Sequence, residues 1–399
     1  GLDWLGLAGD QPAVSQSAKS SRHTEVALAL VASGAAYKCF LSDNELTAIR
    51  NASKQNGVAV RSPWRHRDPS EAPNGASFVV RMKMPSDGST TISDAVQGNV
   101  TVQNRVLDDM VILRADRSPT YMLAVVVDDH DMGITHVIRG DDHLNNAFRQ
   151  YTIYLGMGWQ PPVFAHVPLI HGADGAKLSK RHGAFGIDAY REMGFLPDAM
   201  FSYLLRLGWS YGDKEVITRE DAIKLFDLKR IGKSPARFDG DKLRDVNAHF
   251  IREMGDSALH DLIAPHITPT SNAAQPRILS LLPLLKERAK THLDIIGSLT
   301  YLIHDGGVEI QPSAAALLTK ETKAILLDLD AALPNENWDL DKLTASISRF
   351  LSEKNLKMRD VGPLLRAAVT GMKQSPSIVD IMVLLGRSET SNRIRIACK

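Results

Sequence analysis

The sequence predicts a mixed α/β part followed by an all-helical part, and three observations support this prediction. Between residues 119 and 170, apolar runs of strand length flank a helical segment, as in a βαβ unit with a parallel sheet. From about Pro197 onward, apolar residues recur mainly at helical spacing. The length of 399 residues leaves room for two to four domains.

The first 118 residues predict two helices and several short strands. Residues 23–34 have helical spacing and end in Gly34, a residue type that stops helices. A polar helix is expected over residues 43–55. Residues 61–75 are rich in Pro, Arg and Asp, which indicates a loop. Strand-like runs follow at residues 77–84 and 110–114.

The next segment predicts the βαβ unit. Near-continuous apolar runs at residues 120–129 and 134–140 have the composition of strands that are buried on both faces. Residues 143–156 have helical spacing, and a further strand is expected over residues 162–170. The strands on either side of the helix should pair in parallel.

The C-terminal half predicts helices joined by short linkers. Residues 196–209 carry Pro197 in the first turn of an expected helix. Residues 277–303 are apolar at helical spacing, with a break expected near Pro283. Pro and Asn at residues 333–338 indicate a linker between two helical segments.

Composition and charge are those of an ordinary globular protein. Hydrophobic residues make up 44% and charged residues 23%, and a net charge of +1 gives no global basic field. Two cysteines, Cys39 and Cys398, exclude a disulfide scaffold and a multi-cysteine metal cage. No apolar run has the length of a membrane span, and the first residues do not resemble a signal peptide. We therefore expect a cytoplasmic protein without a membrane partner; because Gly1 is not Met, processing or truncation is compatible with the sequence.

A basic loop at residues 176–183, AKLSKRHG, is the strongest local indication of chemistry. It follows an expected strand and a Gly-rich turn. Its lysines and arginine can wrap a triphosphate and neutralise charge that develops during displacement at phosphorus. A solvated basic turn is the other interpretation of so short a motif.

The loop resembles the second signature of class I aminoacyl-tRNA synthetases, usually written KMSKS. Bacterial glutamyl-tRNA synthetases are similar to the chain in an ordered series of segments, VIRGDDHLNNAFRQ, AHVPLI, KLSKR, YREMGFLPDAMFSYLLRLGW, FDGDKLRDVNAHFIRE and MRDVGPLLRAAVTG. The resemblance covers essentially the whole chain. It implies a class I Rossmann-type catalytic domain that is incomplete at its N-terminus, with an α+β acceptor-binding insert, a stem-contact region and a helical anticodon-binding domain.

The resemblance also implies boundaries for these parts. They are residues 1–22 for the remainder of the first Rossmann half, 23–118 for the insert, 119–185 for the second Rossmann half, 186–256 for the stem-contact region, and 257–399 for the anticodon-binding domain, whose two subdomains meet near residues 315–335. The family's first signature, FAPSPTG, and its RIEDTD segment are not in the sequence. We therefore expect Gly1 to match a point inside the family's chain, which leaves the ATP and glutamate pocket incomplete and one sheet edge unpaired.

The resemblance assigns substrate-binding roles to individual residues. Arg139 and Tyr121 match residues that hold glutamate, and a guanidinium is a bidentate partner for a carboxylate. From the residues alone, Arg139 could instead form an ion pair with Asp141 or Asp142, and Tyr121 could pack in a core. The nucleotide-binding residues implied are Asp142, His143, Lys177, Leu178, Ser179, Lys180 and Arg181, with Lys180 and Lys177 as the catalytic lysines. His143 could equally begin a helix without a ligand.

Residues 229–244 carry six basic and two acidic residues. In the family this neighbourhood belongs to the stem-contact region, where phosphate contacts position the tRNA without reading its sequence. A solvated face is the other interpretation. The expected tRNA-binding residues are Lys229, Arg230, Lys233, Arg237, Lys242 and Arg244.

No metal site is expected in the protein itself. The acids of residues 128–131 are interpreted as a solvated turn rather than a metal site, because successive residues of a strand point to opposite faces. Many family members carry zinc in the insert. Here Cys39 lacks a neighbouring cysteine, and the segment around residues 64–67 supplies only His66 as a further ligand. One Cys and one His do not complete a four-ligand site. The expected ligands are ATP with Mg²⁺, and no zinc.

The reaction implied by the resemblance is ATP-dependent activation of L-glutamate to glutamyl-adenylate, followed by transfer to the 3′ end of a glutamate-acceptor tRNA. Whether a glutamine-acceptor tRNA is also charged is left open, and a monomer is expected. A short transferase that glutamylates a modified tRNA base is disfavoured by the long helical C-terminal part. A non-catalytic tRNA-binding paralogue or remnant is the alternative that the missing first signature favours and that Arg139 and KLSKR disfavour.

Overall fold

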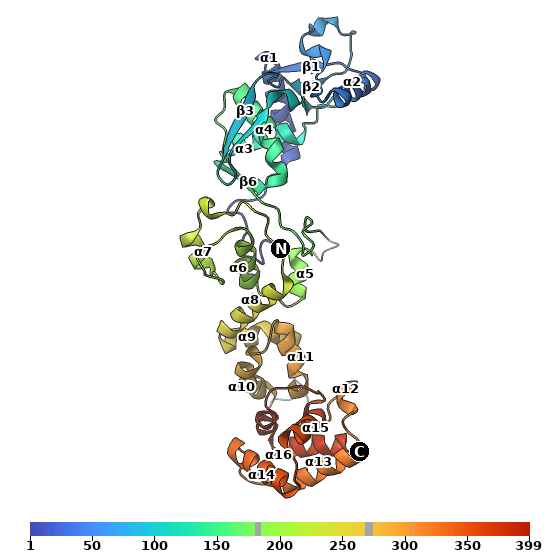
Figure 1. The fold of residues 1–399 in the computed structure, drawn as a ribbon, viewed down its shortest axis with the longest axis vertical. Coiled ribbons are helices and arrows are strands. Elements are labelled where there is room, and N and C mark those ends of the chain that lie inside the picture. Colours follow the sequence, from blue (N-terminus) through green and yellow to red (C-terminus); the bar gives the residue numbers. More distant parts are fainter. Residues whose placement is uncertain (180–184, 268–273, 304) are drawn as a thin grey trace. The chain divides into compact units, whose positions relative to one another are not determined.

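The chain divides into two compact units in the computed structural model, which describes residues 1–179, 185–267, 274–303 and 305–399 (Figure 1). The sheet-containing unit comprises Leu7–Ala184 and Leu204–Asp239. The helical unit comprises Gly1–Gly6, Phe185–Tyr203 and Gly240–Lys399. Of the helices in the described ranges, none is both long enough and apolar enough to cross a membrane.

The sheet-containing unit has two sheets. An antiparallel sheet has the strand order β1-β2-β5, and a mixed sheet has the order β4-β3-β7-β6. The strands are β1 (Ala36–Cys39), β2 (Val79–Met82), β3 (Ser89–Asp94), β4 (Gly98–Gln103), β5 (Val111–Leu113), β6 (His136–Gly140) and β7 (Val163–Val167). The helices are α1 (Ser20–Ala32), α2 (Asp43–Asn56), α3 (Tyr121–Asp131), α4 (Leu144–Met157) and α7 (Arg219–Leu225), and a 3-10 turn, η5 (Asp141–His143), lies between β6 and α4.

The expected βαβ unit is confirmed. Strands β6 and β7 are parallel, with His136 opposite Val163 and Gly140 opposite Val167, and α4 connects them. The buried side chains of α4 include Phe148 and Ile153 at helical spacing. Among the described strands, β6 has a neighbour on one side only. Because β6 and β7 run in the same direction, the residues that follow them meet at one edge of the sheet, where α/β proteins bind ligands.

The strand expected over residues 120–129 is wrong, because this segment forms helix α3. Its buried side chains are Leu123, Ala124, Val126 and Val127, a spacing that puts them on one helical face. They join the core that also contains residues of α1, α4 and β5. A run of valines favours a strand, but packing of this face against the core stabilises the helix instead.

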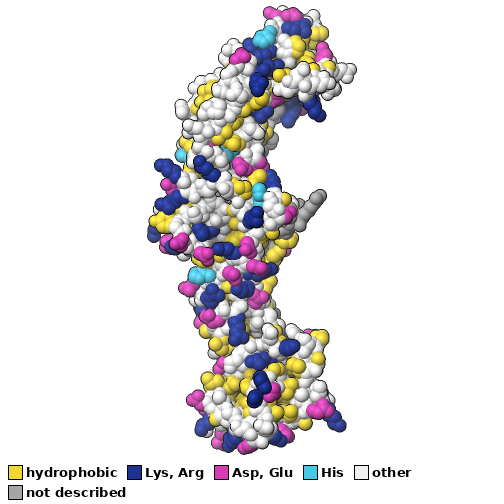
Figure 2. Space-filling model, in the orientation of Figure 1, with side chains coloured by type: hydrophobic (Ala, Val, Ile, Leu, Met, Phe, Trp, Pro, Cys, Tyr) yellow, Lys and Arg dark blue, Asp and Glu magenta, His cyan; other side chains and the backbone are white. Residues whose placement is uncertain are grey.

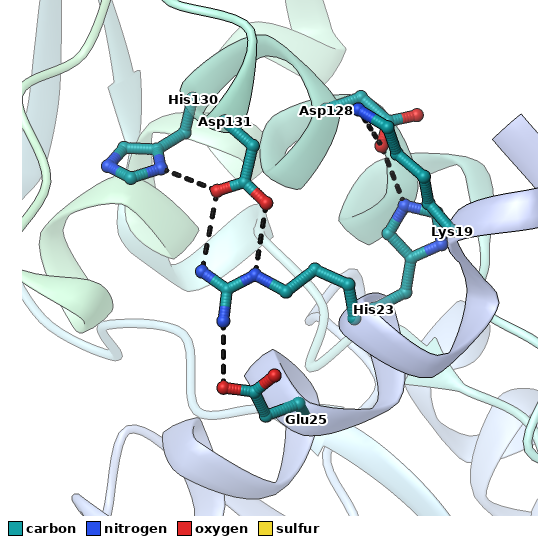
Figure 3. A network of polar contacts seen from close by, with 7 residues as sticks. Lys19, His23, Glu25, Asp128, His130 and Asp131 are labelled. Carbon is teal, nitrogen blue, oxygen red and sulfur yellow. Dashed lines mark hydrogen bonds and ion pairs between the residues drawn. The ribbon is translucent and has the colours of Figure 1, made fainter. Parts of the chain in front are cut away.

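Polar contacts connect the last turn of α3 to α1 (Figure 3). His23 of α1 is fully buried, and its Nε2 lies 2.9 Å from Oδ1 of Asp128. Arg22 donates from Nε to Oδ2 of Asp131 at 3.0 Å, and Nδ1 of His130 lies 3.0 Å from the other oxygen of that carboxylate. The acidic run is therefore a helix end that faces α1, whereas the sequence predicted an exposed turn.

In the helical unit, the helix break expected near Pro283 lies further along the chain. Helix α10 (Ala274–Lys286) continues through Pro283, so the break lies between α10 and α11 (His292–Ile303). Pro283 is exposed, which leaves the backbone carbonyl that it cannot pair accessible to water. The linker expected near residues 333–338 is confirmed, because it separates α13 from α14. The helices are α5 (Ile187–Glu192), α6 (Pro197–Gly208), α8 (Gly240–Glu253), α9 (Asp256–Ile263), α10 (Ala274–Lys286), α11 (His292–Ile303), α12 (Pro312–Ala315), α13 (Lys320–Ala332), α14 (Leu340–Glu353), α15 (Met358–Thr370) and α16 (Ile378–Ala397). The end of α6, from Leu204 on, belongs to the sheet-containing unit.

Candidate active site

Arg139 is the centre of a polar cluster near the carboxyl end of β6. Its Nε donates to Nε2 of His166 at 3.1 Å, and its Nη2 donates to Oε1 of Gln150 at 2.7 Å. Longer contacts join Nη1 to the hydroxyl of Tyr121 at 3.4 Å and Nη2 to the backbone oxygen of His143 at 3.5 Å. The fold thus surrounds one guanidinium with groups from α3, η5, α4 and β7.

Tyr121 and His143 lie side by side next to this guanidinium. Tyr121 is the first residue of α3 and its side chain is 46% exposed, so the core position considered from the sequence is wrong. The two rings are tilted with centroids 6.1 Å apart. Nδ1 of His143 lies 3.1 Å from Nδ2 of Asn146. An exposed phenol beside a partly buried guanidinium gives a surface that can hydrogen-bond a carboxylate.

Asp142 pairs with a lysine of the basic loop rather than with Arg139. Its Oδ2 accepts from Nζ of Lys177 at 2.9 Å, and this hydrogen bond holds the pKa of the Asp142 carboxyl below its usual value. A Cβ at Gly140 would lie 2.7 Å from Oδ1 of Asp142. A side chain at Gly140 would therefore displace the Asp142 carboxylate from its present position.

The first part of the basic loop is shaped by backbone hydrogen bonds. Gly172 N donates to Ala176 O at 2.9 Å, and Leu178 N donates to Ile170 O at 2.9 Å. Oδ1 of Asp174 accepts from Ala176 N at 3.0 Å. Lys177 is exposed and Ser179 is half-buried, whereas Lys180 and Arg181 lie outside the described residues.

The sequence interpretation missed three polar residues behind Arg139, namely Asp94, His166 and Gln150. Asp94 ends β3 and His166 lies in β7; both are buried, and Oδ2 of Asp94 lies 2.6 Å from Nδ1 of His166. Gln150 is buried on the apolar face of α4. Each of the three is a polar residue at a position where the hydrophobic pattern of its strand or helix predicts a buried side chain. A polar residue at such a position is the signal that could have identified them.

The carboxyl of Asp129 interacts electrostatically with the guanidinium of Arg139. Burial raises the pKa of the Asp129 carboxyl, and the positive charge of Arg139 opposes this rise. The hydroxyl of Tyr154 is buried and has no hydrogen-bond partner among the described residues. Burial, together with the charge of Asp129, raises the pKa of this hydroxyl. The Asp129 carboxyl and the buried Tyr154 hydroxyl therefore give Arg139 a local environment in which charge is poorly screened.

Comparison with known families identifies the architecture. A family model described as "tRNA synthetases class I (E and Q), catalytic domain" matches residues 1–245. The chain belongs to the class I tRNA synthetases of the E and Q type. A second model, described as "Anticodon binding domain", matches residues 258–398 of this synthetase. The resemblance found in the sequence and the fold class that it implied are thereby confirmed.

Relatives and solved structures agree with this assignment. A protein named "Glutamate--tRNA ligase 2" from Novosphingobium aromaticivorans is 49% identical over 99% of this synthetase chain and 84% of its own length. "Glutamate--tRNA ligase 1" from Erythrobacter litoralis is 50% identical, over 99% and 83%. A glutamate tRNA ligase from Elizabethkingia meningosepticum, solved with its amino acid, superposes with a TM-score of 0.84 at 29% identity, covering 100% of this chain and 87% of the other.

All six basic residues expected to contact tRNA are exposed in this synthetase. Lys229, Arg230, Lys233 and Arg237 lie in the sheet-containing unit, and the guanidinium of Arg230 lies 4.6 Å from the ring centre of Tyr211. Lys242 and Arg244 lie in α8 of the helical unit, where Nη1 of Arg244 donates to Asp241. On the face shown in Figure 2, basic and acidic side chains are interspersed, which fits the net charge of +1.

Proposed function

We propose that the chain is a glutamate–tRNA ligase that activates L-glutamate with ATP and transfers it to the 3′ end of tRNA. The observation that carries this proposal is the Arg139 cluster, a partly buried guanidinium beside the exposed hydroxyl of Tyr121. The names of the relatives support the same substrate pair, glutamate and tRNA.

The glutamate side chain fits this cluster by charge and by hydrogen bonding. Nη1 of Arg139 makes a long contact of 3.4 Å with the hydroxyl of Tyr121, so a carboxylate oxygen can compete for that donor. The hydroxyl of Tyr121 then donates to the same carboxylate. Glutamine would place an amide where a carboxylate is expected and would lose the charge-assisted bond, which gives discrimination between the two amino acids.

The nucleotide is assigned to the neighbouring basic loop. Lys177 and Asp142 form an exposed pair, which a triphosphate can open by offering a stronger anion to the lysine. Leu178, Ser179, His143, Lys180 and Arg181 complete the proposed set, of which the last two rest on the sequence alone. ATP supplies the leaving group for activation and carries Mg²⁺ with it. The lysines bind and orient its phosphates and neutralise their charge.

The tRNA is assigned to both units. We propose that residues 23–118 receive its acceptor end, that the six basic residues contact its backbone, and that the segment after residue 257 holds its anticodon. A glutamate-acceptor tRNA is the proposed partner of a monomeric, cytoplasmic protein. A glutamine-acceptor tRNA is included in the test below as a second substrate.

We also propose that residues 23–118 fold without zinc. Cys39 is buried with Tyr37 and Trp64, and its Sγ lies 3.3 Å from the hydroxyl of Ser62. Rings and a hydroxyl are groups that zinc does not prefer, and His66 is exposed. Elemental analysis should give far less than one zinc per chain; stoichiometric zinc that a chelator removes together with the fold would contradict this.

The experiment is aminoacylation by the purified full-length gene product. We expect radiolabelled glutamate, but not glutamine or aspartate, to be attached to glutamate-acceptor tRNA in the presence of ATP and Mg²⁺. Parallel reactions with glutamine-acceptor tRNA measure the breadth of acceptor use. Binding of tRNA without any glutamate-dependent charging would identify a non-catalytic tRNA-binding paralogue and contradict the proposal.

A further inference from the structure

Behind Arg139 lies a buried acid–imidazole pair that the proposed reaction does not use. Asp94 is 3% exposed and His166 is not exposed at all. The acid and the imidazole meet at 2.6 Å, and the other ring nitrogen of His166 receives the Nε–H of Arg139 at 3.1 Å. Three side chains from β3, β7 and β6 thus form a line that ends at the candidate substrate site.

The hydrogen bonds define which nitrogen of His166 carries the proton. Oδ1 of Asp94 accepts backbone N–H groups from Val96, Gln97 and His166 at 3.0, 2.9 and 3.1 Å. Burial alone would raise the pKa of Asp94, but these bonds and the imidazole outweigh it, so the pKa is lowered and the carboxylate is ionised. An ionised carboxylate only accepts, so Nδ1 of His166 must donate to it.

Arg139 requires Nε2 of His166 to be a hydrogen-bond acceptor. Its Nε–H is a permanent donor, so Nε2 of His166 must present a lone pair. Both demands are met only by the neutral ring with its proton on Nδ1. Once Nε is held by His166 and Nη2 by Gln150, the plane of the guanidinium is fixed and Nη1 is turned towards Tyr121.

We propose that Asp94 and His166 are positioning residues. Asp94 sets the tautomer of the His166 imidazole, and the imidazole in turn aims the guanidinium of Arg139 at the side-chain carboxylate of the amino-acid substrate. This inference rests on the proposed function, because it assigns Arg139 to that carboxylate. Neither Asp94 nor His166 contacts the substrate in this scheme. Their effect belongs to the recognition of the amino acid and not to the binding of ATP.

Asp94→Asn tests the proposal with little change in shape. The N–H groups of Val96 and Gln97 donate to Oδ1 alone and hold the amide oxygen there, so the amide NH₂ must face Nδ1 of His166. The backbone N–H of His166, which lies 3.1 Å from Oδ1 and 3.2 Å from Oδ2, then donates to the amide oxygen. The ring then carries its proton on Nε2, where it meets the Nε–H of Arg139 and two donors oppose each other. We expect KM for glutamate to rise roughly 10- to 100-fold, with KM for ATP unchanged.

Asp109→Asn is the matched control. Asp109 is also fully buried and accepts from Tyr37 at 2.9 Å, from Arg65 at 2.7 Å and from Met84 N at 3.0 Å, all outside the Arg139 cluster. Loss of this carboxylate should lower the melting temperature without a selective rise in KM for glutamate. An equal rise in both variants would reduce Asp94 to a structural role and overturn the inference.

Nitrogen-15 NMR of histidine- and arginine-labelled protein gives a readout that needs no activity. We expect His166, assigned with His166→Gln, to be protonated on Nδ1 in the wild type and on Nε2 in Asp94→Asn. The Nε–H resonance of Arg139 should shift in Asp94→Asn and not in Asp109→Asn. Protonation of wild-type His166 on Nε2, or unchanged glutamate kinetics after the tautomer has switched, would overturn the proposal. A wild type that shows the expected tautomer but no glutamate-dependent charging would contradict the proposed function and leave the tautomer assignment intact.

Discussion

Arg139 has five N–H donors, and the protein engages them unequally. The bonds to His166 and Gln150 are short, whereas those to Tyr121 and the His143 backbone are 3.4 and 3.5 Å. The short bonds fix the orientation of the side chain, and the long ones leave part of the fork available. A lysine at this position has one ammonium group and no planar fork, so it cannot satisfy His166 and Gln150 while also reaching a carboxylate.

Arg139→Lys should therefore behave as a loss of recognition in spite of its conserved charge. We expect KM for glutamate to increase about 10- to 100-fold, while binding of tRNA is unchanged. Steady-state charging over a range of glutamate concentrations measures the first quantity, and filter binding with labelled tRNA measures the second. Wild-type glutamate kinetics in this variant would remove Arg139 from the glutamate site.

Lys177 allows the nucleotide assignment to be tested separately. Because the Lys177–Asp142 pair is exposed, its removal should change the melting temperature little. If Lys177 binds ATP phosphates in the transition state, Lys177→Ala should slow glutamate-dependent ATP–pyrophosphate exchange by about 10- to 100-fold, measured with tRNA present. Asp142→Asn is the control that frees the lysine without removing it, and we expect a smaller loss. Equal rates in Lys177→Ala and the wild type would place the phosphates elsewhere.

At single positions, the sequence singled out residues that the fold brings together near the carboxyl end of β6, but not the buried residues behind them. Arg139, Tyr121, Asp142 and Lys177 do lie near one another as the motif order implied. The sequence also allowed Tyr121 to pack in a core, and the exposure of its side chain excludes that alternative. Asp94 and His166 were not predicted, because they lie in strands far apart in the sequence and no local spacing brings them together.

Helices α1 and α3 are joined through two contacts of different exposure. The Asp128–His23 contact has a fully buried imidazole, and the Asp131–Arg22 pair is open to solvent. A buried donor that loses its acceptor costs more than an exposed pair that water can replace. Substituting each acid in turn therefore compares the two contacts.

Asp128→Ala should destabilise the sheet-containing unit by about 1–3 kcal/mol, because Nε2 of His23 is left buried without its acceptor. Asp131→Ala should cost about 0–1 kcal/mol, since Arg22 keeps Glu25 and solvent as partners. Urea unfolding followed by circular dichroism compares the two. A larger loss in Asp131→Ala than in Asp128→Ala would show that burial does not determine the strength of this connection.

Strand β3 contributes a pH dependence through Asp94. Because the pKa of Asp94 is lowered in the folded protein, the unfolded chain binds its proton more readily as the solution is acidified. The stabilisation is fully present above the unfolded value of 3.8 and is lost as the pH falls through the folded pKa. Between about pH 5 and pH 3, the wild type should lose more unfolding free energy than Asp94→Asn, measured by urea titration at each pH. Parallel slopes in the two proteins would contradict the shift.

Element prediction succeeded where periodicity was clear and failed where composition was ambiguous. The helices at α1, α2, α4 and α6 were expected from spacing and capping residues. The valine-rich segment of α3 was expected as a strand, since an apolar run has no period of its own and packing decides its form. The break at Pro283 was misplaced because an exposed proline is tolerated within a helix when water reaches the unpaired carbonyl.

The two units divide the proposed steps of the reaction between them. The residues proposed to bind glutamate and the nucleotide belong to the sheet-containing unit, and the region matched to anticodon binding lies in the helical unit. The sequence resemblance predicted this division, although the pattern of residues alone indicated only α/β and helical parts. With a net charge of +1, tRNA binding has to depend on local basic residues rather than on a global field.

The chain should therefore bind tRNA with an affinity that falls as salt increases, because each phosphate contact releases counterions. Lys229→Ala, Lys233→Ala and Arg237→Ala should each lower the steepness of log K against log salt by about one unit or slightly less. Lys214→Ala in the same unit is the control, since its ammonium is already paired with Asp221. Fluorescence anisotropy of labelled tRNA at several salt concentrations gives the slopes. If the three variants keep the slope of the wild type while Lys214→Ala lowers it, the phosphate-contacting surface lies elsewhere in the unit, and the assignment of residues 229–237 to the tRNA backbone is wrong.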